Sequence, residues 1–150
     1  MSTTRPIAQR IADTRALLET QGSGWLATAS PSGTPLVFAV AFLWTGTTAV
    51  IATRDGTPTA RNLDATGKAR LVLGTPQDVV MLDATVARTL PASGATGTIG
   101  TAFVDAMGWD PAVEGPDWRY VELRPTVIQS YRGYHELGGH VLAKDGVWKE

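Results

Sequence analysis

The stretch from Ala52 to Leu63 combines several groups that can hold a phosphate. It leaves an apolar run, turns through Gly56, and places Thr57 and Pro58 where the N-cap and first residue of a helix are expected. A helix N-terminus presents unpaired N–H groups and the positive end of the helix dipole, and both attract anions. The sequence therefore predicts a phosphate site here. The side chains that would add hydroxyl and guanidinium donors are Thr53, Arg54, Thr57, Thr59 and Arg61.

The same residues also fit a simpler interpretation. In this interpretation, Thr57 does no more than cap a short helix, and Arg54 and Arg61 both extend into solvent. From the residues alone, the two interpretations stay open.

Other residue types with chemical potential lack a supporting pattern. His135 and His140 lie in a glycine-rich tail, and two histidines fall short of the three protein ligands typical of catalytic zinc. We expect a surface or interface role for them. The aspartates, the serines and the glycine run 94–100 lack the spacing of an acid–base pair, a nucleophile elbow or a dinucleotide site. We therefore predict no catalytic side chain and no metal site.

Composition is that of one globular domain. The chain has 150 residues, of which 43% are hydrophobic and 18% charged, with a net charge of −1 and no cysteine. The near-neutral charge argues against nucleic acid as a partner, and the missing cysteines exclude disulfides and thiolate chemistry. No apolar run has the roughly 20 residues of a membrane helix, and residues 1–15 lack a secretory h-region. We expect one cytoplasmic domain over 1–150, with an N-terminal helical part (1–21) and a C-terminal tail (132–150).

The order of elements predicts a mainly β fold with short helices. Three apolar runs joined by short polar turns form an antiparallel meander, followed by the helix at 57–65. A break at Arg124-Pro125 divides the late strand in two, and residues 109–117 are expected to be irregular. Six or seven antiparallel strands then make a closed or nearly closed barrel. The expected helices are 5–20, 57–65 and 99–107, and the expected strands are 25–30, 35–44, 49–53, 68–74, 79–89, 118–123 and 126–131, with a loop over 91–97 and a final hairpin near 145–148.

These elements resemble those of a known superfamily. The first turn with Gly24 and Gly33, the long strand, and the Thr-x-x-Gly-x-x-x-x-Arg-Asn-Leu run from Thr53 to Leu63 are similar to the split β-barrels that bind FMN or F420. This superfamily includes pyridoxamine 5′-phosphate oxidase and its actinobacterial relatives. The resemblance covers roughly residues 22–130, with 118–125 as the late strand.

The resemblance implies a homodimer with the cofactor at the subunit interface. The strand Leu36–Val40 would run along the isoalloxazine ring, and Thr53–Arg61 would hold the phosphate. The turn at Gln77 and Asp78 would reach the cofactor of the partner subunit. The cofactor-binding residues expected from the resemblance are Val37, Phe38, Ala39, Thr53, Arg54, Thr57, Thr59, Arg61, Asn62, Gln77 and Trp118.

Two departures from the family pattern are visible. Many members carry a lysine where this chain has Thr59, so fewer cations are available for the phosphate. True pyridoxamine-phosphate oxidases end in an Arg-Leu-x-Pro segment, whereas this chain ends in Gly146-Val147-Trp148-Lys149-Glu150. Oxidation of vitamin B6 is therefore not the expected activity.

Two classes of function remain. The first is an FMN-binding oxidoreductase that transfers hydride to a small molecule, since the flavin carries the chemistry and no catalytic side chain is required. The second is a binding module without turnover. F420 is the alternative cofactor. Its glutamate tail benefits from basic residues, so the net charge of −1 and the presence of only three lysines favour FMN. The resemblance to actinobacterial relatives favours F420.

Overall fold

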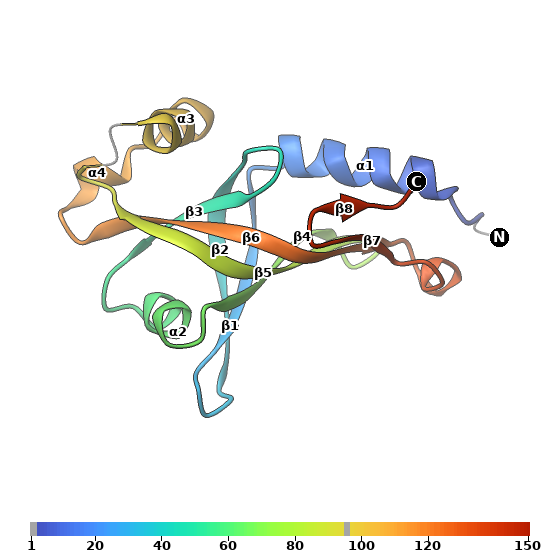
Figure 1. Cartoon of the computed structure of the whole chain (residues 1–150), viewed down its shortest axis with the longest axis horizontal. Coiled ribbons are helices and arrows are strands. Elements are labelled where there is room, and N and C mark those ends of the chain that lie inside the picture. Colours follow the sequence, from blue (N-terminus) through green and yellow to red (C-terminus); the bar gives the residue numbers. More distant parts are fainter. Residues whose placement is uncertain (1–2, 95–96) are drawn as a thin grey trace.

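The part of the chain that the structure describes forms eight strands and a few helices. A computed structural model describes residues 3–94 and 97–150 (Figure 1). The elements are α1 (Ile7–Thr20), β1 (Ser23–Ala29), β2 (Pro35–Trp44), β3 (Ala49–Arg54), α2 (Pro58–Thr66), β4 (Lys68–Thr75), β5 (Asp78–Pro91), α3 (Thr98–Met107), α4 (Pro111–Glu114), β6 (Trp118–Tyr131), the 3₁₀ turn η1 (Tyr134–Glu136), β7 (Val141–Lys144) and β8 (Val147–Trp148).

Six of the strands close into a barrel. The strands follow the spatial order β3-β2-β1-β4-β5-β6, and an antiparallel ladder between β3 and β6 closes the ring. The hairpin of β7 and β8 extends the sheet beyond β6. The predicted mainly β fold with an antiparallel split barrel is confirmed, and the expected final hairpin is present.

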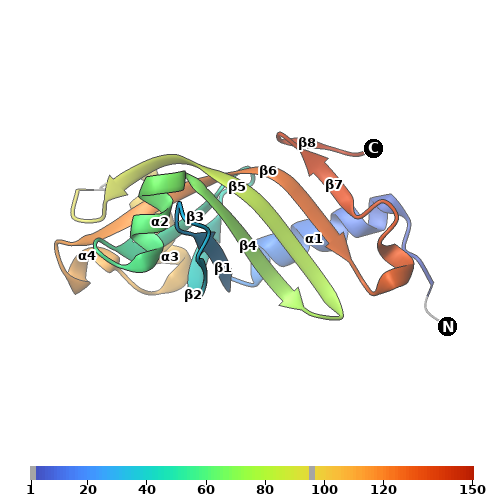
Figure 2. The same cartoon turned by 90° about the horizontal axis from the view of Figure 1, so that it is seen from below.

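The helices gather at the two ends of the long strands β5 and β6. Figure 2 shows α2, α3 and α4 at one end, and α1 together with the hairpin of β7 and β8 at the other. One apolar cluster fills the barrel and includes Phe42, Leu71 and Leu123. A second cluster lies where α3 covers β2, β3 and β6, and it includes Phe103 and Tyr120, whose ring centroids are 5.2 Å apart.

The predicted break in the late strand is wrong. β6 runs without interruption through Pro125, which pairs with Ala84 of β5. The register shifts next to this pair, so that Thr126 is an extra residue on β6. Proline is tolerated within a strand next to a β-bulge, because the ladder is locally disrupted there and does not need an N–H from every residue.

One smaller expectation also differs from the structure. The segment expected to be irregular contains α4, because Asp110 caps it by accepting a hydrogen bond from the Ala112 N–H (3.0 Å) and Pro111 starts it. The loop predicted over 91–97 includes residues 95–96, which lie outside the described residues.

Candidate functional site at the opening between β2 and β3

The barrel opens between its second and third strands. β2 and β3 pair only from Phe42 to Trp44 on one strand and from Ala49 to Ile51 on the other. The first part of β2 pairs with β1 alone, and the last part of β3 pairs with β6 alone. Helix α2 follows β3 after a short loop and contacts β1, β2, β3 and β4. The two segments predicted to hold a cofactor therefore flank one opening.

On the β2 side of this opening, apolar side chains are exposed. Phe38 lies on the same side of β2 as Phe42, which is buried, but β3 has already separated from β2 and leaves Phe38 61% exposed. Val37 points to the opposite, outer side and is 58% exposed, and Ala39 lies on that side across from Trp25. All three predicted residues of β2 are accessible in a single chain.

On the other side, the N-terminus of α2 is capped as the sequence predicts. The Thr57 hydroxyl accepts a hydrogen bond from the Ala60 N–H (3.2 Å), and Pro58 has no N–H to offer. The Arg61 N–H is bonded to the Thr57 carbonyl (2.9 Å). The Thr59 N–H meets no acceptor in the described part of the chain. The helix start thus offers an anion fewer N–H donors than an uncapped helix would.

Three of the predicted polar residues at this helix are buried. Thr53 and Thr59 are almost inaccessible, and the Thr53 hydroxyl lies 3.4 Å from that of Thr57. Asn62 donates its side-chain amide to the Thr28 hydroxyl on β1 (3.1 Å) in a buried hydrogen bond. Asn62 therefore anchors α2 to β1 through its NH₂ group.

The guanidinium groups near the helix differ in how they are paired. Arg54 lies 3.1 Å from the Asp117 carboxylate. Arg61 is exposed and donates to the Gly56 carbonyl. Within the described residues, Arg61 contacts no carboxylate, so its charge is the one most available to a ligand.

Arg119 also lies at the site, and sequence reasoning missed it. It stands opposite Thr53 in the ladder between β3 and β6, and its side chain is 13% exposed. It hydrogen-bonds the Asp64 carboxylate (2.9 Å) and the Ala60 carbonyl (3.2 Å). Its Nε lies 3.1 Å from Asp55 without hydrogen-bond alignment. No local pattern signals these contacts, because they join residues that are far apart in the sequence.

The last two predicted residues differ in their distance from the opening. Trp118 stands opposite Arg54 at the start of β6, half-buried, and packs edge-to-face on Trp109 with ring centroids 5.2 Å apart. Gln77 is exposed in the turn between β4 and β5. The eight residues of β4 separate this turn from α2 by roughly 25 Å, so Gln77 cannot reach the opening of its own chain.

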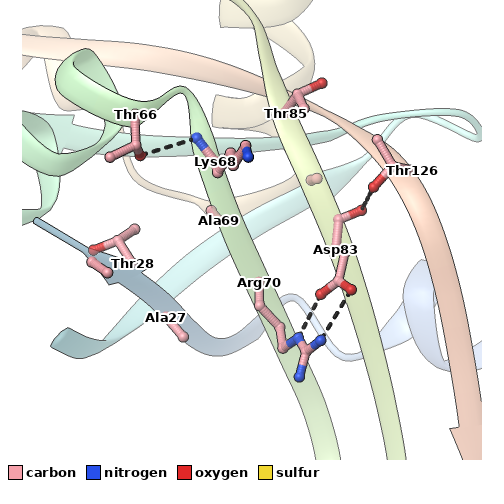
Figure 3. A pocket seen from close by; sticks show the side chains of 11 residues that line it. Ala27, Thr28, Thr66, Lys68, Ala69, Arg70, Asp83, Thr85 and Thr126 are labelled. Carbon is pink, nitrogen blue, oxygen red and sulfur yellow. Dashed lines mark hydrogen bonds and ion pairs between the residues drawn. The ribbon is translucent and has the colours of Figure 1, made fainter. Parts of the chain in front are cut away.

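A hollow of about 710 Å³ lies on the face of β1, β4 and β5 next to the end of α2 (Figure 3). Arg70 and Asp83 form a two-point ion pair across it, with one N–O distance of 3.0 Å, and hydrogen bonding to Asp83 raises the pKa of Arg70. Lys68 and Thr85 complete its polar rim. Its Ala27 pairs with Val37, so the hollow borders the outer side of the exposed β2 segment.

The described residues contain neither a metal-binding cluster nor a membrane-spanning helix. Among residues 3–94 and 97–150, no group of three or more histidine, aspartate and glutamate side chains is placed to hold a metal ion. None of the helices in those ranges is long and apolar enough to cross a membrane.

An antiparallel barrel that separates between two neighbouring strands, with a capped helix entering at the gap, defines a split-barrel protein. The family model described as pyridoxamine 5′-phosphate oxidase matches residues 12–125, and the chain belongs to this family. The resemblance predicted from the sequence is thereby confirmed.

Solved structures share the fold of this chain. An F420 reductase shares 25% sequence identity with this chain. The two superpose with a TM-score of 0.64, and the match covers 76% of this chain and 94% of the reductase. A heme binding protein from Mycobacterium smegmatis shares 20% sequence identity with a TM-score of 0.67, and the match covers 89% of this chain and 57% of that protein. A protein from Clostridium acetobutylicum related to general stress protein 26 shares 17% identity with a TM-score of 0.61, and the match covers 86% of this chain and 92% of that protein. A search of curated protein sequences found no match.

Proposed function

We propose that this protein binds a flavin-type cofactor, FMN in the first place, at the opening between β2 and β3 and uses it to transfer hydride to or from a small molecule. The observation that carries the proposal is the convergence of two features at one opening. The exposed strand segment Val37–Ala39 lies on one side, and the start of α2 with Thr57 and Arg61 lies on the other.

The phosphate of the cofactor would lie at the start of α2. Arg61 would turn from the Gly56 carbonyl to the phosphate, because a charged acceptor forms a stronger hydrogen bond than a neutral one. The Thr59 N–H and the Thr57 hydroxyl would add neutral donors. Arg54 and Arg119 stay with their carboxylates, so the net positive charge at the phosphate is small and we expect moderate affinity.

The ring of the cofactor would lie against the first part of β2. The backbone of this segment has no strand on its β3 side, so its N–H and C=O groups can meet the polar edge of a flavin. Phe38 provides an apolar surface beside it. When bound, the flavin supplies the hydride chemistry, and the chain binds it, orients it and excludes water.

A second copy of the chain would complete the site. Trp25 and Val37 are each more than half exposed on the outer side of two paired strands, and Phe38 is exposed on the other side of β2, so both sides of this strand segment present apolar side chains that a partner would bury. Gln77 lies too far from its own opening to contact a ligand there, and the turn of a second copy would bring it close. We therefore propose a homodimer with the cofactor at its interface.

F420 is the alternative cofactor, and the similarity to an F420 reductase supports it. Its glutamate tail would require cations outside the phosphate site. The hollow beside α2 offers Lys68 and Arg70, although Arg70 is paired with Asp83. A binding module that holds either cofactor without turnover is the second candidate function.

The test is a parallel titration of the purified protein with FMN and F420, followed by fluorescence and isothermal calorimetry. We expect FMN to bind and to stay bound through desalting, and Arg61→Ala to weaken binding by about tenfold, as the loss of one charge-assisted contact would. Arg88→Ala is the matched control, since Arg88 is exposed and pairs with Glu122. No binding of FMN or F420 at concentrations on the order of 50 µM would overturn the proposal.

Turnover is tested separately on the loaded protein. Bound flavin that accepts hydride from a reduced nicotinamide and passes it to an acceptor such as a quinone supports the oxidoreductase. Bound flavin that exchanges no hydride supports the binding module. Hemin is included as a third ligand, because one of the similar structures is described as a heme binding protein.

A further inference from the structure

A second cavity lies at the opposite end of the barrel from α2. It has a volume of about 410 Å³ and is formed by three segments: the turn between β2 and β3, the bulged part of β6, and the hairpin of β7 and β8. The residues that characterise it are Trp44, Thr47, Arg124, Ile128, Asp145 and Trp148. A volume of this size suits a small organic ligand.

Two tryptophans form apolar walls of this cavity. Trp44 is the last residue of β2 and Trp148 the last of β8, and both are half-buried against the core of the barrel. The guanidinium carbon of Arg15 lies 4.7 Å from the centre of the Trp148 ring, so a cation–π contact from α1 holds this ring. An indole that is held in place loses little freedom when a ligand packs on it.

Arg124 gives the cavity an available positive charge. It is exposed, and no carboxylate of the described residues lies within ion-pair distance of it. Most other arginines of the chain have such a partner, for example Arg88 with Glu122 on the neighbouring strands. Arg124 lies two residues before the bulge residue Thr126, and bulges change the direction of nearby side chains.

Asp145 limits the charge that the cavity can accept. It occupies the left-handed region (φ 49°) in the turn between β7 and β8, and its N–H is bonded to the Thr126 carbonyl (2.9 Å). This bond fixes the turn next to the bulge. A carboxylate at the rim repels a ligand with two negative charges more strongly than a ligand with one.

We propose that this cavity binds a small aromatic monocarboxylate. The ring of the ligand lies against the indoles of Trp44 and Trp148, and its carboxylate receives two parallel hydrogen bonds from Arg124. The combination of flat apolar walls with one free guanidinium selects for a planar ring that carries an anionic group.

This site is separate from the opening between β2 and β3. The cavity adjoins the first residue of β3, whereas the candidate phosphate site follows its last residue, and the six residues of the strand span roughly 17 Å. Binding here therefore does not depend on the proposed cofactor.

Calorimetric titration of the full chain with indole-3-propionate and with tryptamine tests the proposal. The two probes share the indole ring and differ in the sign of their charge. We expect indole-3-propionate to bind at least about tenfold more tightly than tryptamine, and Arg124→Gln to remove most of that difference. Lys68→Gln is the control, because it removes a cation near α2, away from the cavity, and should leave the binding unchanged.

Trp148→Ala should abolish binding, with thermal unfolding to verify that the variant is folded. Arg124 is exposed, so we expect Arg124→Gln to fold. If Trp148→Ala unfolds, the comparison of the two probes in Arg124→Gln still decides the proposal. Equal affinity for the two probes, an unchanged affinity in Arg124→Gln, or no binding of indole-3-propionate at about 2 mM would overturn the proposal.

Discussion

The carboxylate of Asp64 on α2 lies 2.9 Å from the guanidinium of Arg119 on β6. The helix at the barrel opening is thereby tied to the strand that closes the barrel. Arg119 also donates to the Ala60 carbonyl, so two contacts hold the helix on the same side. The position of the candidate phosphate site thus depends on Arg119, which lies 55 residues after Asp64 in the sequence.

Arg119→Gln should lower the free energy of unfolding by about 1–2 kcal/mol, because a largely buried guanidinium loses its acceptors on α2. Urea denaturation measures this change. Asp64 is exposed, so the pair itself should contribute only about 0.5–1 kcal/mol in a double-mutant cycle with Asp64→Asn. Strict additivity of the two single changes would contradict the tie between α2 and β6.

Thr57→Ala should destabilise the protein by about 1 kcal/mol, because the Ala60 N–H loses its cap. Thr57→Ser keeps the hydroxyl and is the matched control for both stability and cofactor binding. If the hydroxyl also contacts the phosphate, Thr57→Ala weakens FMN binding under conditions where the protein is fully folded, and Thr57→Ser does not. Equal stability of the two variants would show that the cap contributes nothing.

Phe38→Asp should shift the proposed dimer toward monomer by at least about tenfold in its dissociation constant, because a carboxylate would be buried without a partner. Sedimentation velocity over a range of protein concentrations measures the shift. Val113→Asp is the control, since Val113 is 81% exposed on α4, away from β2. A wild-type chain that sediments as a monomer throughout would contradict the dimer itself.

Glu136 should make the stability of the protein depend on pH in the acid range. Its side chain is fully buried, and hydrogen bonding to Arg5 lowers its pKa from 4.5 to about 2, against the opposing effect of burial. Because the folded-state pKa is the lower one, the stabilisation is complete above about pH 4.5 and disappears as the pH falls to about 2. The stability lost over this range should be on the order of 3 kcal/mol.

Thermal unfolding across this pH range measures the effect. Glu136→Gln removes the titrating group, so its unfolding free energy should be lower at neutral pH and change less between pH 4.5 and 2. Arg132 and Asp13 complete the ion-pair network around the N-terminal part of α1. A wild-type profile that is as flat as that of Glu136→Gln would contradict the role of this carboxylate.

The parts of the fold that the sequence predicts well are those fixed by neighbouring residues. The cap of α2 follows from Thr57 and Pro58, and the meander of β1 to β3 follows from apolar runs separated by polar turns. The break predicted at Pro125 is wrong because the bulge at Thr126 depends on the register with β5, which no local pattern contains. Arg119 was missed for the same reason, since its role arises only when β6 pairs with β3.

The ladder between β3 and β6 also determines when the molecule becomes complete. Its two strands are separated in the sequence by α2, β4, β5, α3 and α4, so this ladder is complete only after the chain has reached Leu123. Pairing between such distant segments is slow, because a long loop must close before the contacts form. During synthesis, the segment from Thr53 to Arg61 leaves the ribosome early but waits for Arg119 to reach its neighbours. If this segment holds the proposed cofactor, a chain that binds it has therefore completed the ladder between β3 and β6, and binding would report closure of the barrel.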